Sequence, residues 1–169
     1  MTAKAAVKSD RHAARHEAAH AVVAARLGLP LVYADIIEHG TGLTGFTSRS
    51  GRTKLGRGAD ANPTACAIVG AAGIVAEGED RRRDFFISID HPIAGDLLQL
   101  RRVAQRLGIS ADSDDDRFMS WARVVIQRAR TLLRRDRGAA WRRVTTALLR
   151  EHRLSGAIVY SLVRKKGTK

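Results

Sequence analysis

The chain has 169 residues and a formal net charge of +13, which attracts nucleic acid, acidic membranes or acidic protein segments without choosing among them. This length suits one domain and is short for two, and with only 5% aromatic residues the core must come from small aliphatic side chains, which favours packed helices. The chain has one cysteine, Cys66, so an intrachain disulfide is excluded, which fits a reducing compartment. No apolar run reaches the roughly 20 residues that span a bilayer. We therefore expect a cytoplasmic protein without a transmembrane segment.

The first predicted element is a helix that is capped by Ser9 or Asp10 and runs to about Leu27, so residues 1–9 are expected to be a flexible N-terminus. Small apolar residues recur three and four positions apart along it, which is the periodicity of a helix with one buried face. Glycine and proline follow and end the helix. This helix contains the sequence HEAAH at residues 16–20.

Two short strands are predicted after this helix. The β-branched, apolar segment LVYADIIE predicts a first strand of about six residues, and GLTGFTS predicts a second, short and exposed strand. The polar and basic stretch RSGRTKLGRGADAN is expected to be a mobile loop.

The rest of the chain predicts helices. Asn62 and Pro63 start a helix that is small and apolar nearly all round, so it should be the buried central helix. Asp96 opens an amphipathic helix, and further helices are expected from about Asp114 to Arg135, from Asp136 to about Arg153 and, after a cap at Ser155, up to a basic tail at 164–169. We therefore expect a mainly α (α+β) fold, with a single domain over residues 10–163 and a small two- or three-stranded β element after the first helix.

The sequence HEAAH matches the pattern HExxH. On a helix, His16 and His20 share one face, and two imidazoles so placed can ligate one Zn²⁺. Glu17 points toward the open position of the metal, where it could take a proton from the metal-bound water, the nucleophile, and give it to a leaving amine. The pattern therefore predicts a zinc-dependent peptidase with Glu17 as general base, and its ordinary alternative is a solvated polar face of an alanine-rich helix.

Catalytic zinc normally has a third protein ligand, and the residues alone leave several candidates. His12 lies one turn before His16, but three ligands on successive turns span about 12 Å, too far for one ion, so we expect His12 to face solvent or to support a ligand from behind. Each candidate further along also has an ordinary explanation, such as an exposed helix end, a cap, a solvent-facing side chain or a first-turn acid. These candidates are Glu77, Asp90, His91 and Asp96.

Five segments occur in an order that one known family shares. They are HEAAHAVVA, DIIEHGTGLTGFT, GAAGIVAEG, GDLLQLRRVAQRLG and ARTLLRRDRGAAWRRVTTALLREHRLSGAIV. Together they resemble the protease domain of the FtsH-type ATP-dependent zinc metalloproteases over residues 12–163. The first segment differs from the family's HEAGHAVVA only at Ala19, and the third lacks the arginine of the family's GRiAEE pattern.

The resemblance implies a helical zinc-peptidase domain in which His16, His20 and Asp96 are the metal ligands and Glu17 is the catalytic base. It thereby selects Asp96 from the open candidates. It also implies that an exposed sheet edge at residues 42–48 pairs with an extended substrate, although an ordinary hairpin edge is equally compatible with that stretch. The substrate-binding residues expected there are Leu43, Thr44, Gly45, Phe46 and Thr47.

The family's ATPase module and membrane helices have no counterpart in these residues. We therefore expect flexible or unfolded polypeptide substrates, or a separate ATPase that supplies them. The alternative function is a non-catalytic binding protein that uses the basic surface to interact with nucleic acid or an acidic protein partner. No nucleic-acid-binding motif stands out, and arginines on solvated helix faces are the plainer explanation of the charge.

Overall fold

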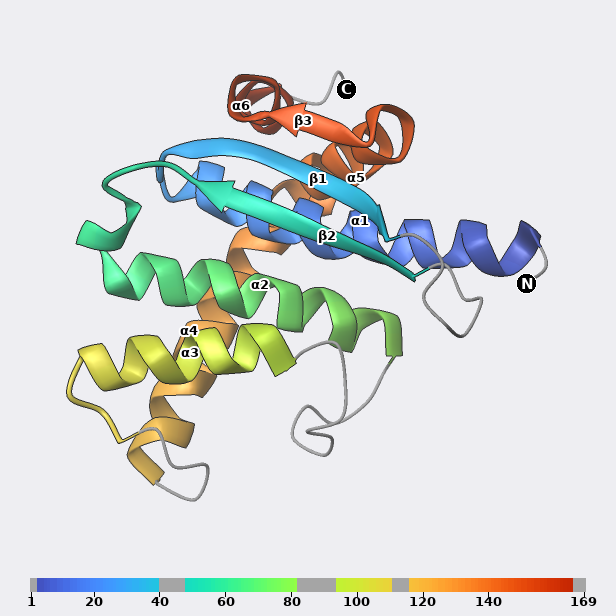
Figure 1. Ribbon diagram of the computed structural model, residues 1–169. Coiled ribbons are helices and arrows are strands. Elements are labelled where there is room, and N and C mark those ends of the chain that lie inside the picture. Colours follow the sequence, from blue (N-terminus) through green and yellow to red (C-terminus); the bar gives the residue numbers. More distant parts are fainter. Residues whose placement is uncertain (1–2, 40–47, 82–93, 111–115, 166–169) are drawn as a thin grey trace.

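The computed structural model describes residues 3–39, 48–81, 94–110 and 116–165 of the chain (Figure 1). Within these ranges, helices form most of the structure and three strands form a small sheet. The helices are α1 (Ala3–Arg26), α2 (Pro63–Arg81), α3 (Ala94–Arg106), α4 (Asp116–Arg134), α5 (Ala139–Glu151) and α6 (Gly156–Arg164). The strands are β1 (Leu31–His39), β2 (Ser48–Leu55) and β3 (Arg153–Ser155). The expected mainly α fold with a small β element is confirmed.

The sheet is antiparallel, with the strand order β2-β1-β3. β1 pairs with β2 from Leu31 opposite Leu55 to His39 opposite Ser48. β3 pairs with the first half of β1, where Ala34 lies opposite Leu154. Among the described strands, β2 therefore forms one edge of the sheet, and it is the strand drawn nearest to α2 in Figure 1.

The first helix packs against the sheet on one side and against α2 and α5 on others, and α3 lies on α2 (Figure 1). Its inward residues are small, and Ala14, Ala18, Ala21 and Val22 are fully buried. Small side chains allow neighbouring elements to approach α1 closely, so the alanine-rich sequence produces a dense core with few aromatic residues. One hydrophobic cluster joins residues from the first helix to the last.

Several predicted boundaries are confirmed. α2 begins at Pro63, and the Asn62 side chain accepts a hydrogen bond from Ala65 N at 3.0 Å, as a helix cap does. Ser155 caps α6 by accepting a hydrogen bond from Ile158 N. No helix in the described ranges has the combined length and apolar character needed to cross a bilayer.

The start of the first helix is a correction. α1 begins at Ala3 rather than at Ser9 or Asp10, so residues 3–9, expected to be a flexible N-terminus, belong to its first turns. Residues 3–8, with the sequence AKAAVK, are good helix formers. A downstream polar residue that could cap the helix therefore does not mark its start.

The second strand is also a correction. β2 occupies Ser48–Leu55, and all of it except Ser48 falls in the stretch expected to be a mobile loop. Residues 42–47 of the predicted strand lie outside the described ranges. Along β2, the charged Arg52 and Lys54 are exposed, whereas Gly51 and Thr53, which alternate with them, are less so. The inward positions carry small or polar residues, so the hydrophobic alternation that would reveal a strand is missing.

The connection between α4 and α5 differs from the expected helix start at Asp136. A 3₁₀ turn covers Arg135–Gly138, and α5 begins at Ala139 and ends at Glu151. Asp136 instead accepts a hydrogen bond from Ala140 N at 3.2 Å. β3 lies where the end of one helix at Arg153 and the cap of the next at Ser155 were expected, because three residues are too few for a strand pattern to show.

Candidate metal centre

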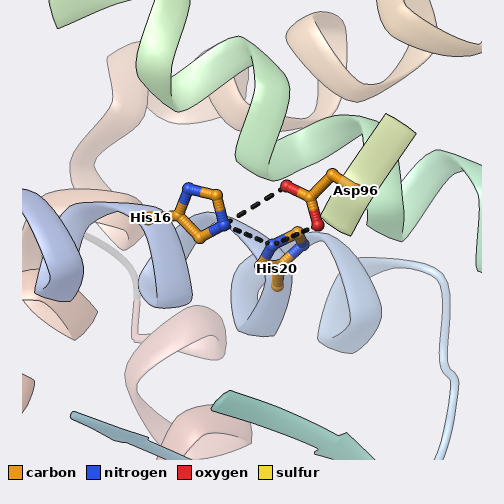
Figure 2. Close-up of side chains that lie close together, drawn as sticks. All are labelled: His16, His20 and Asp96. Carbon is orange, nitrogen blue, oxygen red and sulfur yellow. Dashed lines mark hydrogen bonds and ion pairs between the residues drawn. The ribbon is translucent and has the colours of Figure 1, made fainter. Parts of the chain in front are cut away.

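Three side chains from two helices converge on one point (Figure 2). His16 and His20 lie one turn apart on α1, and Asp96 lies in the first turn of α3. His16 Nε2 is 3.0 Å from His20 Nε2, and carboxylate oxygens of Asp96 lie 3.2 Å from His16 Nε2 and 3.4 Å from His20 Nε2. In the part of the chain that the structure describes, these are the side chains whose ligand atoms lie close enough together to hold a metal ion.

The spacing of the three donors fits a tetrahedral ion. Bonds of about 2.0 to 2.1 Å to a tetrahedral zinc ion place neighbouring ligand atoms about 3.3 Å apart. The three measured separations are 3.0, 3.2 and 3.4 Å. Asp96 Oδ2 is buried and lies 3.2 Å from His16 Nε2, so this acceptor faces the space among the three donor atoms. The two imidazoles and one carboxylate therefore fit a divalent ion such as Zn²⁺.

Hydrogen bonds on the far side of each imidazole orient the rings. His20 Nδ1 lies 2.7 Å from the backbone oxygen of Val69, and His16 Nδ1 lies 3.2 Å from Glu77 Oε1. Both partners accept, so each Nδ1 carries the proton and donates it. When such an imidazole is neutral, it keeps a lone pair on Nε2, and both Nε2 atoms can then bind a metal ion at the point where Asp96 lies.

A glycine on α2 makes room for the three ligands. A Cβ added at Gly73 would overlap Asp96 Oδ2, and it would lie only 2.5 Å from His20 Nε2 and 2.6 Å from His16 Cε1. The ligand atoms therefore occupy the place where any other residue would put its side chain. At Gly70, one turn earlier on the same helix, an added Cβ would meet Gln99 at an ordinary 3.6 Å. The glycine requirement is specific to the position beside the ligands.

Behind His16, a buried carboxylate joins two histidines of α1. Glu77 is only 2% exposed, and its Oε1 lies 2.6 Å from His12 Nε2 and 3.2 Å from His16 Nδ1. Burial alone would raise the pKa of Glu77, but the hydrogen bonds from His12 and His16 lower that pKa to about 2. His12 thus contacts the carboxylate that orients His16, and the exposed helix end considered for Glu77 is wrong.

The residue between the two histidine ligands is held by the sheet. Glu17 is 5% exposed, and its Oε2 accepts a hydrogen bond from the Thr53 hydroxyl of β2 at 2.8 Å. Its side chain occupies the space beside Gly51, where an added Cβ would lie 2.7 Å from Glu17 Cδ. Burial raises the pKa of Glu17, and the neighbouring His20 and His16 oppose that rise. A carboxylate with a raised pKa accepts a proton more readily near neutral pH.

Opposite charges are concentrated at the ligands themselves. Burial alone would lower the pKa of His16, but the carboxylates of Asp96 and Glu77 raise it to about 10. Burial alone would raise the pKa of Asp96, but His20 and His16 hold it well below its usual range. The buried carboxylates thus favour positive charge at the imidazoles, whether a proton or a metal ion supplies it.

Sequence reasoning identified the converging residues but not their surroundings. His16, His20 and Asp96 lie together, whereas Glu77 contacts the far side of the His16 ring. Gly73 and Thr53 were missed, since a glycine in an alanine-rich helix and a threonine in a basic stretch carry no signal of their own. The candidates that lie outside the described residues are Asp90, His91, Leu43, Thr44, Gly45, Phe46 and Thr47.

Compared with known proteins, the chain matches no family model and no curated sequence. The likeness to FtsH-type protease domains therefore stays an expectation from the sequence. Function must be inferred from the donors, their spacing and the groups that hold them.

Proposed function

We propose that the protein is a zinc-dependent peptidase that hydrolyses peptide bonds in flexible or unfolded polypeptides. The observation that carries this proposal is the convergence of His16, His20 and Asp96 at the spacing of a tetrahedral ion, with Glu17 on the same helix. The resemblance to FtsH-type protease domains supports it, because that family uses the same pattern of ligands and base.

The types of side chain that converge favour a catalytic zinc ion over a purely structural one. Structural zinc sites are closed by four protein ligands, usually with several cysteines, whereas catalytic sites keep three ligands and one open position. The described group offers two imidazoles and one carboxylate, and the only cysteine, Cys66, is not part of it. When bound, a zinc ion would polarise a substrate carbonyl and lower the pKa of a water molecule.

The protein's own residues would then move the proton. Glu17 accepts a proton from the attacking water and returns it to the amine that leaves when the peptide bond breaks. The Thr53 hydroxyl holds one oxygen of Glu17 at 2.8 Å, which leaves the other oxygen to carry the proton. His12, Glu77 and the backbone of Val69 do not touch the reacting atoms, and they keep the two imidazoles in a fixed orientation.

The substrate is proposed to bind along β2. This strand forms an edge of the sheet among the described residues, and an edge strand can pair through its backbone with an extended peptide of almost any sequence. Thr53 joins this strand directly to Glu17. The expected substrate residues Leu43, Thr44, Gly45, Phe46 and Thr47 come immediately before β2, and their role stays a prediction.

Metal analysis and one substitution test the proposal. We expect about one zinc per chain after reconstitution in both the wild type and Glu17→Gln, because Glu17 is not a ligand. Hydrolysis of unfolded casein should fall at least about a hundredfold in Glu17→Gln, the usual contribution of a general base. Glu151→Gln is the matched control, since Glu151 is exposed on α5 and pairs with Arg150, and it should keep full activity.

A zinc-loaded wild type that cleaves no flexible substrate would refute the peptidase. The same holds if Glu17→Gln cleaves as fast as the wild type. In either case, the non-catalytic binding protein would become the better explanation of the fold. Failure of the chain to take up zinc, manganese or cobalt after careful metal removal would contradict the metal centre itself.

A further inference from the structure

A second site, away from the metal ligands, is formed by α1, the end of α4, the turn after it and α5. These elements surround a hollow of about 800 Å³. Five arginines line it, and no acidic residue does among those the structure describes there. The five are Arg11, Arg15, Arg134, Arg137 and Arg142. Four of them are exposed and Arg15 is half-buried, so the guanidinium groups are concentrated around one accessible space.

A buried tryptophan holds one of these arginines in place. Trp141 is 8% exposed, and its indole N–H donates to the backbone oxygen of Arg15 at 2.8 Å. The Arg15 guanidinium lies over the same ring, 4.7 Å from its centre. This cation–π contact positions the charge of Arg15 before any ligand arrives. It also covers a face of the indole, so the ring is a poor platform for stacking a planar ligand.

The turn after α4 and the start of α5 present two more arginines. Asp136, Arg137 and Gly138 have φ angles of 56°, 54° and 71°, three successive residues in the left-handed region. Two of them are not glycine, so this backbone is strained and must be held by its surroundings. Arg142 Nη1 donates to the backbone oxygen of Arg137 at 2.8 Å, which ties the turn to α5. The strained turn thus fixes Arg137 and Arg142 beside each other.

The carboxylate nearest to this turn is engaged elsewhere. Asp136 Oδ1 pairs with Arg26 at 2.8 Å, and its Oδ2 lies 3.8 Å from Arg143 and accepts a hydrogen bond from Ala140 N. Neither Arg26 nor Arg143 lines the hollow. Asp136 therefore offsets charge outside the hollow and is not one of the residues that line it.

We propose that this hollow binds a compact polyphosphate group, a diphosphate or triphosphate. Guanidinium groups present paired N–H donors that match phosphate oxygens, and arginine is suited to this recognition. A phosphate chain carries several negative charges close together, so it matches several guanidinium groups around one space better than a single carboxylate does. The group could belong to an inorganic polyphosphate or to a nucleotide, and the covered face of Trp141 offers little to a base.

Calorimetric titration of the full chain with tripolyphosphate, in about 150 mM salt to screen diffuse attraction, tests the proposal. We expect saturable binding of one tripolyphosphate per chain, with a change in Trp141 fluorescence in a Trp121→Phe background. A nucleoside triphosphate should bind with similar affinity if the phosphates alone are recognised, and more tightly if the base adds contacts. Citrate, which is also multiply charged, should bind at least tenfold more weakly, and equal binding of citrate would overturn the phosphate assignment.

Two sets of variants locate the binding. Arg11→Gln with Arg137→Gln should weaken tripolyphosphate binding about tenfold to a hundredfold, since each lost charge-assisted hydrogen bond is a large share of the affinity. Arg123→Gln with Arg128→Gln removes the same charge from exposed positions of α4 outside the hollow, and it should change the affinity less than about twofold. Equal weakening by both pairs would mean that only the overall charge attracts the anion, and it would overturn the site.

A third variant changes the charge of the hollow at an exposed position, so a loss of binding cannot be explained by misfolding. Thr146→Glu puts a carboxylate into the hollow from an exposed position of α5. It should weaken tripolyphosphate binding at least tenfold without lowering the melting temperature, because the new charge offsets repulsion among the arginines. Unchanged binding by Thr146→Glu, or the absence of saturable binding to the wild type, would refute the proposal.

Discussion

The candidate metal centre and the arginine-lined hollow both use α1, but their charged side chains differ: the first combines histidines with carboxylates, and the second has guanidinium groups. In the metal centre, the carboxylates of Glu17, Glu77 and Asp96 are buried or nearly so, and histidines lie beside them. In the hollow, five guanidinium groups face one space whose described lining has no carboxylate. A cluster of imidazoles and carboxylates suits a small cation, whereas a hollow lined by guanidinium groups suits an anion.

The two regions also use different faces of the same helix, α1. Arg11 and Arg15 lie four residues apart on α1, and His12 and His16 form a second such pair shifted by one residue. One residue is a rotation of about 100° around a helix, so the two pairs face different neighbours. The arginines meet α5 and the preceding turn, and the histidines meet α2 and α3. A single helix thereby contributes to both candidate sites, and substitutions should be able to disrupt either one alone.

Gly73→Ala should have the largest effect on the metal centre. The new methyl group would occupy the place of the ligand atoms, so zinc content should fall from about one per chain to near zero. The crowded atoms are ends of side chains that can turn away, so the fold should persist. Elemental analysis and circular dichroism check both expectations, and tripolyphosphate binding to the hollow should be unchanged.

Gly70→Ala is the matched control for this substitution. It adds the same methyl group to the same helix, but at an ordinary contact distance from Gln99. We expect it to retain zinc and to be more stable by up to about 1 kcal/mol, because alanine favours a helix over glycine. Full zinc content in Gly73→Ala would show that the ligands do not converge as described.

Glu77→Gln should have the next largest effect. The amide keeps the size of the side chain but removes the charge that orients His16 and contacts His12. Loss of such a partner behind a ligand typically weakens metal binding by about tenfold to a hundredfold. Competition with a fluorescent zinc chelator measures the change. An unaltered zinc affinity would indicate that Glu77 only fills space, and tripolyphosphate binding should again be unaffected.

The two regions also differ in how much of them the sequence predicts. His16 and His20 follow from their spacing alone, because a helix brings residues four apart together. Asp96 lies far along the chain, and its residue type alone did not distinguish it from the other candidates for the third ligand. Only the family resemblance selected it over Glu77, Asp90 and His91. The arginines of the hollow are visible in the sequence as charge, but their convergence depends on how α1, α4 and α5 pack.

The local surroundings were the least predictable part of the fold. β2 was expected to be a loop, since a strand that sets Gly51 and Thr53 toward α1 carries no apolar alternation. The role of Gly73 depends on an approach between α1, α2 and α3 that no single segment encodes. Local pattern thus predicts element type where an apolar face is buried, and it fails where small or polar residues face the interior.

Thr53→Val should have the smallest effect. It tests the position of Glu17, the proposed base, without changing a proposed metal ligand. Valine keeps the shape of threonine but cannot donate to Glu17, so the carboxylate loses the contact that holds one of its oxygens. We expect kcat on unfolded casein to fall about tenfold, the equivalent of one hydrogen bond, with KM and zinc content unchanged. Thr53→Ser restores the hydroxyl and should restore most of the activity. If serine does not rescue the activity, or if zinc is lost along with it, β2 supports the fold of the site rather than the position of Glu17.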